Sequence, residues 1–338
     1  MLKFLAFADL HYMKGMYKTP VESLERIMKR AHDENVDFVV QLGDFSNSLA
    51  GSPEIVEPYF ENPYGLPVYG IYGNHELEKP GNTMALINSY LCNRPVVFGE
   101  EEETDEAGYW YTDIGGYRLI GMDSNYMYHP EEDRWYHNSA DTWPFVKGTI
   151  LPNSFGVSQL RWLDSVLTDT EAKGLKAIVL THPAVSGFFK GSPDTDRVQE
   201  IFARHKGTVS MAINGHHHTD RVFVRDGTVY FDVNTVHNIY WEKQTEHHYK
   251  DTHTFVYTDY DESGNRVKTE VRPLTSLRQG KNTWFTTEPL SAVVTIADDG
   301  TVTIKGSKAE WMYGVKPLFE CDEVRPEIRD RVIRFGEE

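Results

Sequence analysis

Short apolar runs alternate with longer amphipathic stretches over most of the chain. Runs with the length of buried strands lie at residues 3–8, 36–42, 67–72, 175–182 and 208–215. Between the first two runs, residues 19–34 repeat apolar side chains at helical spacing, behind a Thr-Pro pair that suits a helix start. Strands that alternate with helices predict parallel βαβ units, and therefore an α/β fold.

Further along, the pattern predicts more strands, two helices and two hairpins. They are expected as strands at 109–114 and 117–123, helices at 158–173 and 192–205, and hairpins at 221–233 and 291–306 with Asp-Gly in their turns. Residues 124–155 are aromatic-rich and show no regular period, so we expect an irregular insertion there. The composition turns polar and helix-poor near residue 240. We therefore expect a main domain over 1–240 and a β-rich extension or small domain over 241–338.

Composition and charge narrow the function classes. The chain has 338 residues and a formal net charge of −17, and no dense Lys/Arg cluster offsets that charge. An acidic surface repels polyanions, so long nucleic acid is not an expected partner. The two cysteines, Cys92 and Cys321, are too few for a disulfide framework. No apolar run approaches the ~20 residues of a membrane span, and the N-terminal run is too short for a signal peptide, so we expect a soluble cytoplasmic protein.

Polar side chains of the metal-binding types follow one predicted strand after another. The blocks are Asp9-Leu10-His11, Gly43-Asp44, Gly73-Asn74-His75-Glu76, Thr181-His182 and Gly215-His216-His217-His218. In an open α/β sheet, ligands bind outside the carboxyl ends of the strands, where these blocks would meet. Side chains two positions apart share a face of an extended chain, so His216 and His218 can converge while His217 points away.

The donor types indicate which ions would suit the site. Carboxylate, imidazole and amide oxygen together suit Mn, Fe or Zn. Candidate ligands are Asp9, His11, Asp44, Asn74, His182, His216 and His218. These are too many for one tetrahedral ion and suit two ions that share Asp44, about 3.5–4 Å apart. Each block alone has an ordinary alternative, such as a solvated turn or a His-rich surface loop, and only the set at successive strand ends favours metal.

Taken together, the blocks resemble the signature of the calcineurin-like metallophosphoesterases over about residues 1–235. The resemblance implies a four-layer fold in which two mixed β-sheets are flanked by helices, with residues 1–240 as the catalytic domain. It implies that one metal ion is held by Asp9, His11, Asp44 and His218, and the second by Asp44, Asn74, His182 and His216. It also implies that His75 is not a ligand, and that it donates a proton or a hydrogen bond to the phosphate or the leaving oxygen.

Departures from the family patterns narrow the subfamily. Gly43-Asp44 is followed by Phe45-Ser46-Asn47, without the Tyr ligand of purple acid phosphatases. The Asp-Arg-Gly block of the Ser/Thr phosphoprotein phosphatases is missing as well. What remains is a bacterial-type branch that includes the class III cyclic-nucleotide phosphodiesterases, and the segment 158–163 resembles a helix of that branch.

These points predict a phosphohydrolase in which a hydroxide bridging two metal ions attacks a phosphate ester. We favour a small phosphodiester or nucleotide as substrate, because aromatic side chains of the 124–155 insertion could stack on a nucleobase. Candidate substrate contacts are Asn47, Tyr126, Tyr128, His129 and Trp135. Asn47 and Glu76 are also candidates for orienting the imidazoles. The alternatives are a phosphomonoesterase, a non-catalytic metal-binding scaffold, and a nuclease, which would need a basic track; self-association stays open.

Overall fold

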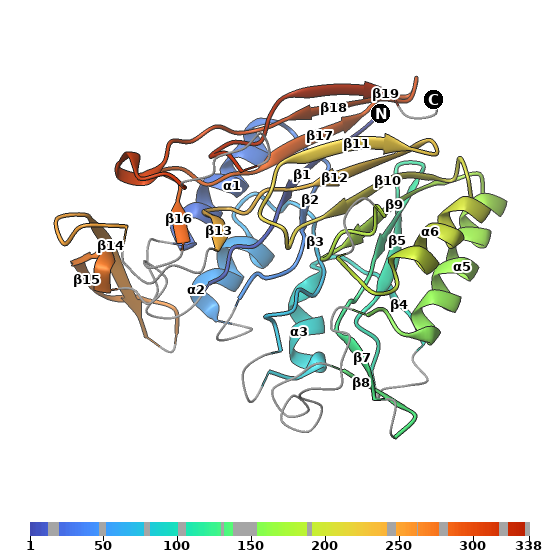
Figure 1. Ribbon diagram of the computed structural model, residues 1–338, viewed down its shortest axis with the longest axis horizontal. Coiled ribbons are helices and arrows are strands. Elements are labelled where there is room, and N and C mark those ends of the chain that lie inside the picture. The colour runs from blue at the N-terminus through green and yellow to red at the C-terminus, as the bar shows by residue number, and fades with distance from the viewer. Residues whose placement is uncertain are drawn as a thin grey trace.

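The computed structural model describes residues 1–12, 20–46, 52–77, 82–100, 106–129, 132–137, 154–187, 191–241, 248–261, 263–276, 283–317 and 324–334. Two large mixed β-sheets form the body, and helices lie on their outer faces (Figure 1). The predicted α/β architecture of two sheets flanked by helices is confirmed.

The first sheet has six strands in the order β19-β18-β17-β1-β2-β3. Its members are β1 (Leu2–Phe7), β2 (Phe38–Gln41), β3 (Val68–Gly70), β17 (Ala292–Ile296), β18 (Thr301–Lys305) and β19 (Arg331–Arg334). Strands β1, β2 and β3 run parallel, whereas β17 pairs antiparallel with the free edge of β1. The C-terminal strands therefore complete the sheet that the first residues begin, while the boundary near residue 240 stays a prediction.

The second sheet has seven strands in the order β11-β12-β10-β9-β6-β5-β4. They are β4 (Val97–Phe98), β5 (Trp110–Ile114), β6 (Tyr117–Gly121), β9 (Lys176–Thr181), β10 (Val209–Asn214), β11 (Arg221–Arg225) and β12 (Thr228–Asp232). Strands β6, β9, β10 and β12 run parallel to one another, whereas β5 and β11 pair antiparallel with β6 and β12. The predicted hairpin at 221–233 is confirmed, with Asp226 and Gly227 both at positive φ in its turn.

Alternation along β1 explains the layers. Phe4 and Ala6 belong to the core between the two sheets, whereas Leu5 and Phe7 pack with apolar residues of α1 (Pro20–Asp33) on the outer face. On the other side, α5 (Val157–Ala172) and α6 (Thr195–Arg204) cover the second sheet through a separate apolar cluster. Both faces of each sheet are thus buried, which agrees with the near-continuous apolar runs in the sequence.

Several short elements complete the described part of the chain. They are α2 (Pro53–Val56), a π-helix (Glu57–Glu61), α3 (Met84–Leu91), 3-10 turns at Leu274–Ser276 and Met312–Gly314, and the strand pairs β7 (Tyr126–His129) with β8 (Arg134–His137), β13 (Asn238–Trp241) with β16 (Thr283–Phe285), and β14 (Thr254–Tyr260) with β15 (Arg266–Pro273). The insertion expected to be irregular therefore contains the β7–β8 hairpin. Its first strand, Tyr-Met-Tyr-His, has no apolar–polar alternation that would announce a strand.

Candidate metal centre

The candidate side chains gather where strands of both sheets end. The first sheet contributes Asp9 and His11 after β1, Asp44 after β2, and Asn74 and His75 after β3; the second contributes His182 after β9, and His216 and His218 after β10. Three overlapping groups of these side chains have ligand atoms within 4.8 Å of one another. The groups are Asp9, His11 and His218; His11, Asp44 and His75; and Asp44, His182 and His216.

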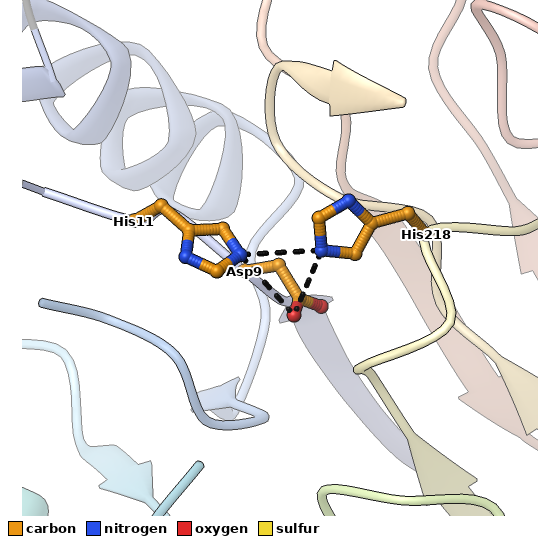
Figure 2. Close-up of side chains that lie close together, drawn as sticks. All are labelled: Asp9, His11 and His218. Carbon is orange, nitrogen blue, oxygen red and sulfur yellow. Dashed lines mark hydrogen bonds and ion pairs between the residues drawn. The ribbon is translucent and has the colours of Figure 1, made fainter. Parts of the chain in front are cut away.

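Figure 2 shows the first group, in which Asp9, His11 and His218 point toward one another. The Nε2 atoms of the two imidazoles are 3.2 Å apart. Oδ1 of Asp9 lies 3.3 Å from Nε2 of His218 and 3.8 Å from Nε2 of His11. The backbone N–H of His216 donates to both Asp9 oxygens, at 3.2 and 3.0 Å, which ties the loop after β10 to the end of β1.

Asp44 joins the groups. Its Oδ2 lies 3.2 Å from Nε2 of His182, 3.7 Å from Nε2 of His11 and 3.8 Å from Nε2 of His75. Nδ1 of His216 lies 3.2 Å from Nε2 of His182 and completes the third group. One carboxylate thus faces two sets of imidazoles, as a ligand shared between two ions would.

His217, the middle residue of the His run, belongs to none of the three groups. Its Nε2 accepts a hydrogen bond from the backbone N–H of Ala184 at 3.3 Å. The ring therefore braces the loop that follows His182, and only His216 and His218 contribute to the groups.

The backbone at these blocks adopts a conformation that is uncommon for side-chain-bearing residues. Five of them have φ between 50° and 69°: Asp9, His11, Asp44, His216 and His218. A left-handed conformation in a non-glycine residue costs roughly 1–3 kcal/mol and persists where the surroundings impose it. Such strain is concentrated at functional sites, and here it turns the side chains toward a common point.

Glycines in the same blocks permit the close approach of the strand ends. A Cβ on Gly43, which has φ +88°, would lie 2.4 Å from Nδ1 of His182. A Cβ on Gly73 would lie 2.2 Å from both N and Oδ1 of Asp44. Any side chain at these positions would displace a candidate ligand, which gives the Gly-Asp and Gly-Asn patterns a physical reason.

Two contacts fix the orientation of the site. The Glu76 carboxylate accepts from the backbone N–H groups of Asp44, Phe45, Ser46 and Gly73, at 3.2, 2.5, 3.3 and 2.6 Å. Glu76 therefore fastens the turn after β2 to the turn after β3, and within the described residues its carboxylate bonds to backbone N–H groups and not to the imidazoles that the sequence suggests it orients. That second role belongs to the carbonyl oxygen of Leu42, which lies 2.7 Å from Nδ1 of His182 and leaves Nε2 to face the cluster.

The electrostatics of the cluster suit a cation. Burial lowers the pKa of His11 to about 4 and that of His216 to about 3, so both rings are neutral near pH 7. Burial works against ionisation of Asp9 and Asp44, but the neighbouring histidines prevail and hold the pKa of both carboxyls below the usual range. Burial also opposes a charged His182, yet Asp44 raises the pKa of that ring to about 10. Its proton balances Asp44 as a metal ion would.

Asn74 supplies a direct test of whether the residues fit a metal. Its Oδ1 atom is buried and has no hydrogen-bond partner among the residues that the structure describes. A buried amide oxygen without a partner costs free energy unless something else, such as a metal ion, engages it. The donor set and this oxygen both fit a bound divalent cation.

The remaining candidates lie on or near the β7–β8 hairpin. Tyr126 is fully buried against Ala107 and Tyr109. Tyr128 is 37% exposed, and its ring packs on Trp135 at 5.3 Å between centroids. The backbone of His129 ends β7, but its side chain lies outside the described residues, as does Asn47 entirely.

Sequence reasoning missed a buried polar group formed by Asp123, Asn125 and His137. Asp123 and His137 lie 2.6 Å apart, and Asn125 donates to the carbonyl oxygen of Gly73 at 3.0 Å. The sequence holds one signal for this group: Asp123 is the last residue of the predicted strand 117–123, much as Asp9 and Asp44 lie just after predicted strands. The partner His137 could not be found without the hairpin.

Comparisons with known proteins bear on the family and on the fold. The family model of the calcineurin-like phosphoesterases matches residues 2–220, and the search of the curated proteins finds no match. Among solved structures, the chain is similar to a dimetal phosphatase from Danio rerio, with a TM-score of 0.60 at 14% identity over 99% of both chains. It is also similar to GAP50, the anchor in the inner membrane complex of Plasmodium, with a TM-score of 0.47 at 11% identity over 100% of this chain and 90% of that one.

Identities this low show the fold alone, whereas the family model covers more than half of the chain. Within the described residues, no helix is long and apolar enough to cross a membrane. The match to the family model, on a fold that places the signature blocks at one edge of two sheets, identifies the chain as a phosphoric-ester hydrolase that belongs to the calcineurin-like phosphoesterase family.

Proposed function

We propose that this hydrolase cleaves small phosphate esters with the help of two metal ions, Mn or Fe, with Zn as a further option. The observation that carries the proposal is the position of Asp44, whose Oδ2 atom lies 3.2 Å from Nε2 of His182 and 3.7 Å from Nε2 of His11. The buried Oδ1 of Asn74, which has no hydrogen-bond partner within the described residues, supports it independently.

The proposed ligand sets are those that the family resemblance implies, and the groups of Asp9, His11 and His218 and of Asp44, His182 and His216 support them. Asp9, His11, Asp44 and His218 would hold one ion, and Asp44, Asn74, His182 and His216 would hold the other. When bound, such ions draw charge from the phosphoryl oxygens and lower the pKa of a coordinated water, which is the nucleophile in two-metal hydrolases.

His75 is the candidate for proton transfer. Its side chain is 28% exposed, whereas those of Asp44, His11 and His182 are at most 3% exposed. Its backbone N–H donates to Oδ1 of Asp44 at 3.0 Å, which holds the residue beside the cluster while the ring stays accessible to a substrate. An imidazole placed there can donate a proton to the leaving oxygen or a hydrogen bond to the phosphate.

A competing interpretation makes His75 a ligand, because its Nε2 also lies within 4.8 Å of His11 and Asp44 ligand atoms. The variant His75→Ala separates the two roles. We expect its metal content to equal that of the wild type while the rate falls about a hundredfold. Loss of one ion would make His75 a ligand instead.

We favour a phosphodiester or nucleotide substrate, with a phosphomonoester as the alternative. The support is the β7–β8 hairpin, where Tyr128 and Trp135 offer partly exposed rings on which a base could stack. Tyr126 is less suited, since its ring is buried in the hairpin's own core.

The deciding experiment assays the purified protein, freed of metal and restored with Mn²⁺, on bis-p-nitrophenyl phosphate and p-nitrophenyl phosphate. Faster cleavage of the diester supports a phosphodiesterase, and the reverse supports a phosphatase. Asp44→Ala should bind neither ion tightly and should be inactive. His32→Ala, an exposed histidine of α1 stacked on Tyr64, serves as the matched control and should behave as the wild type. Two bound ions without turnover of either ester would contradict the proposed cleavage of small phosphate esters.

A further inference from the structure

A buried polar cluster lies beside the metal centre and has no part in the chemistry proposed above. Asp123 follows β6, Asn125 precedes β7, and His137 ends β8, with exposed fractions of 0%, 2% and 8%. The hairpin therefore folds its last residue back onto the carboxylate just ahead of its first strand. A buried carboxylate is costly unless donors surround it, so the way in which Asp123 is satisfied matters.

Asp123 is the centre of this cluster. Its Oδ2 lies 2.6 Å from Nε2 of His137, and its Oδ1 accepts from the backbone N–H and the Nδ2 of Asn125, at 3.0 and 2.9 Å. Its own backbone is held at both ends by Gln159 of α5, through bonds of 2.8 Å to Oε1 and 2.6 Å from Nε2. The carboxylate is thus anchored to a long helix and cannot drift with the hairpin.

Asn125 links the cluster to the turn that holds Asn74, a candidate metal ligand. Its Nδ2 also donates to the carbonyl oxygen of Gly73, at 3.0 Å. That carbonyl belongs to the peptide bond that joins Gly73 to Asn74. The ring of His137 packs edge-on against Tyr72, the residue before Gly73, with centroids 5.9 Å apart. The turn that presents Asn74 is therefore contacted twice by the cluster.

We propose that Asp123, Asn125 and His137 are positioning residues, which set the orientation of the Gly73–Asn74 peptide and through it the aim of Asn74 and His75. A rotation of that peptide would swing the Asn74 amide oxygen away from its ion and carry His75 with it. The hairpin that offers aromatic rings to the substrate is thereby coupled to the turn that faces the phosphate. The inference rests on the proposed function, because it assigns Asn74 to a metal ion.

The test compares variants that break the chain of bonds at different links. Asn125→Ala removes the donor to Gly73, and His137→Leu removes the donor to Asp123. His137→Gln keeps an N–H donor. Tyr136→Phe, on the same strand, loses a surface bond to Glu132 and serves as the matched control. Mn²⁺ binding is measured by calorimetry and by the electron paramagnetic resonance of the coupled ion pair. Kinetics are measured on the aryl phosphate that the wild type cleaves.

We expect Asn125→Ala to lower the affinity for one of the two Mn²⁺ ions about 10- to 100-fold and to leave the affinity for the other unchanged. Its kcat should fall by a similar factor while KM changes by less than about twofold, since the loss lies in positioning and not in substrate binding. His137→Gln should recover a large part of what His137→Leu loses. Tyr136→Phe should match the wild type in every measurement.

The outcomes separate this inference from the function on which it rests. If the wild type does not bind two Mn²⁺ ions, the proposed function fails. If the wild type binds two and Asn125→Ala binds both with unchanged affinity and full kcat, the positioning role is overturned. The positioning role would also be overturned if Asn125→Ala lost affinity for both ions equally and had a lower melting temperature. Asn125 would then have only a structural role. Should His137→Leu fail to fold, Asn125→Ala still decides. It removes the bond to Gly73 together with one bond to Asp123, while the backbone N–H of residue 125 and His137 still donate to that carboxylate.

Discussion

Replacing Gly73 by alanine tests how closely the turns after β2 and β3 must approach. Gly73 is not among the residues with positive φ, so the added methyl group acts through space and not through backbone strain. Its Cβ would lie 2.2 Å from N and Oδ1 of Asp44, whereas ordinary contact begins at 3.4 Å. The atoms it meets are a backbone amide and an anchored carboxylate, so Asp44 must retreat by about 1 Å.

A displacement of about 1 Å in a catalytic group lowers the rate about a hundredfold. We therefore expect kcat/KM of Gly73→Ala to fall about a hundredfold. Because Asp44 belongs to both proposed ligand sets, the affinity for both Mn²⁺ ions should fall as well. The free energy of unfolding should drop by about 1–3 kcal/mol, the usual range for an overpacked interior. Steady-state kinetics, metal titration and urea unfolding measure the three quantities.

Gly116→Ala is the matched control. Gly116 lies between β5 and β6 with φ +85°, and a Cβ there would meet nothing within 4 Å. Its replacement should cost about 1 kcal/mol through the left-handed backbone and leave kinetics and metal binding unchanged. If Gly73→Ala kept full activity and two tightly bound ions, the close approach would not matter and the reasoning would be refuted.

Two further predictions concern stability. His11 and His216 have pKa values of about 4 and 3, against an ordinary 6.5. In the folded chain these two rings bind protons less readily than in the unfolded chain, so the metal-free protein should lose stability as the pH falls from 6.5 toward 4. His182, whose pKa is raised to about 10, acts in the opposite direction and only between pH 6.5 and 10. Thermal melts in chelator from pH 6.5 to 4 check the expected loss, and a flat melting temperature contradicts it. Asp220→Ala removes the buried carboxylate that binds Arg329 and Arg331 at 2.9 and 2.7 Å. It should lower the free energy of unfolding by about 2 kcal/mol, as urea unfolding would show, with no loss of bound metal.

The parts of the site that the sequence predicts are those with a local cause. Asp9, Asp44 and His182 each follow an apolar run, and parallel strands bring their carboxyl ends to one edge, so their neighbourhood could be expected without coordinates. The spacing of His216 and His218 likewise separates them from His217. The position of Glu76 in its block marks it as a candidate, but its four backbone donors come from two turns that only the tertiary structure brings together.

The parts that could not be predicted depend on contacts between distant segments. The pair Asp123 and His137 needs the β7–β8 hairpin, whose aromatic strands carry no alternating pattern. The helix Pro53–Val56 is too short for an apolar stripe to repeat, so its segment reads as a loop. In each case tertiary packing, and not local propensity, decides the conformation.

The pairing of β1 with β17 bears on how the protein folds as it is synthesised. Leu2 of β1 pairs with Ile296 of β17. During synthesis, β1 therefore cannot pair with β17 until nearly the whole chain has been made. Contacts this distant in sequence form slowly, and until they form β1 presents an open, apolar edge. A nascent chain that has emerged only to residue 240 would carry every candidate ligand and still have this edge uncovered. The final strands thus act late, as the step that turns an aggregation-prone intermediate into a finished sheet.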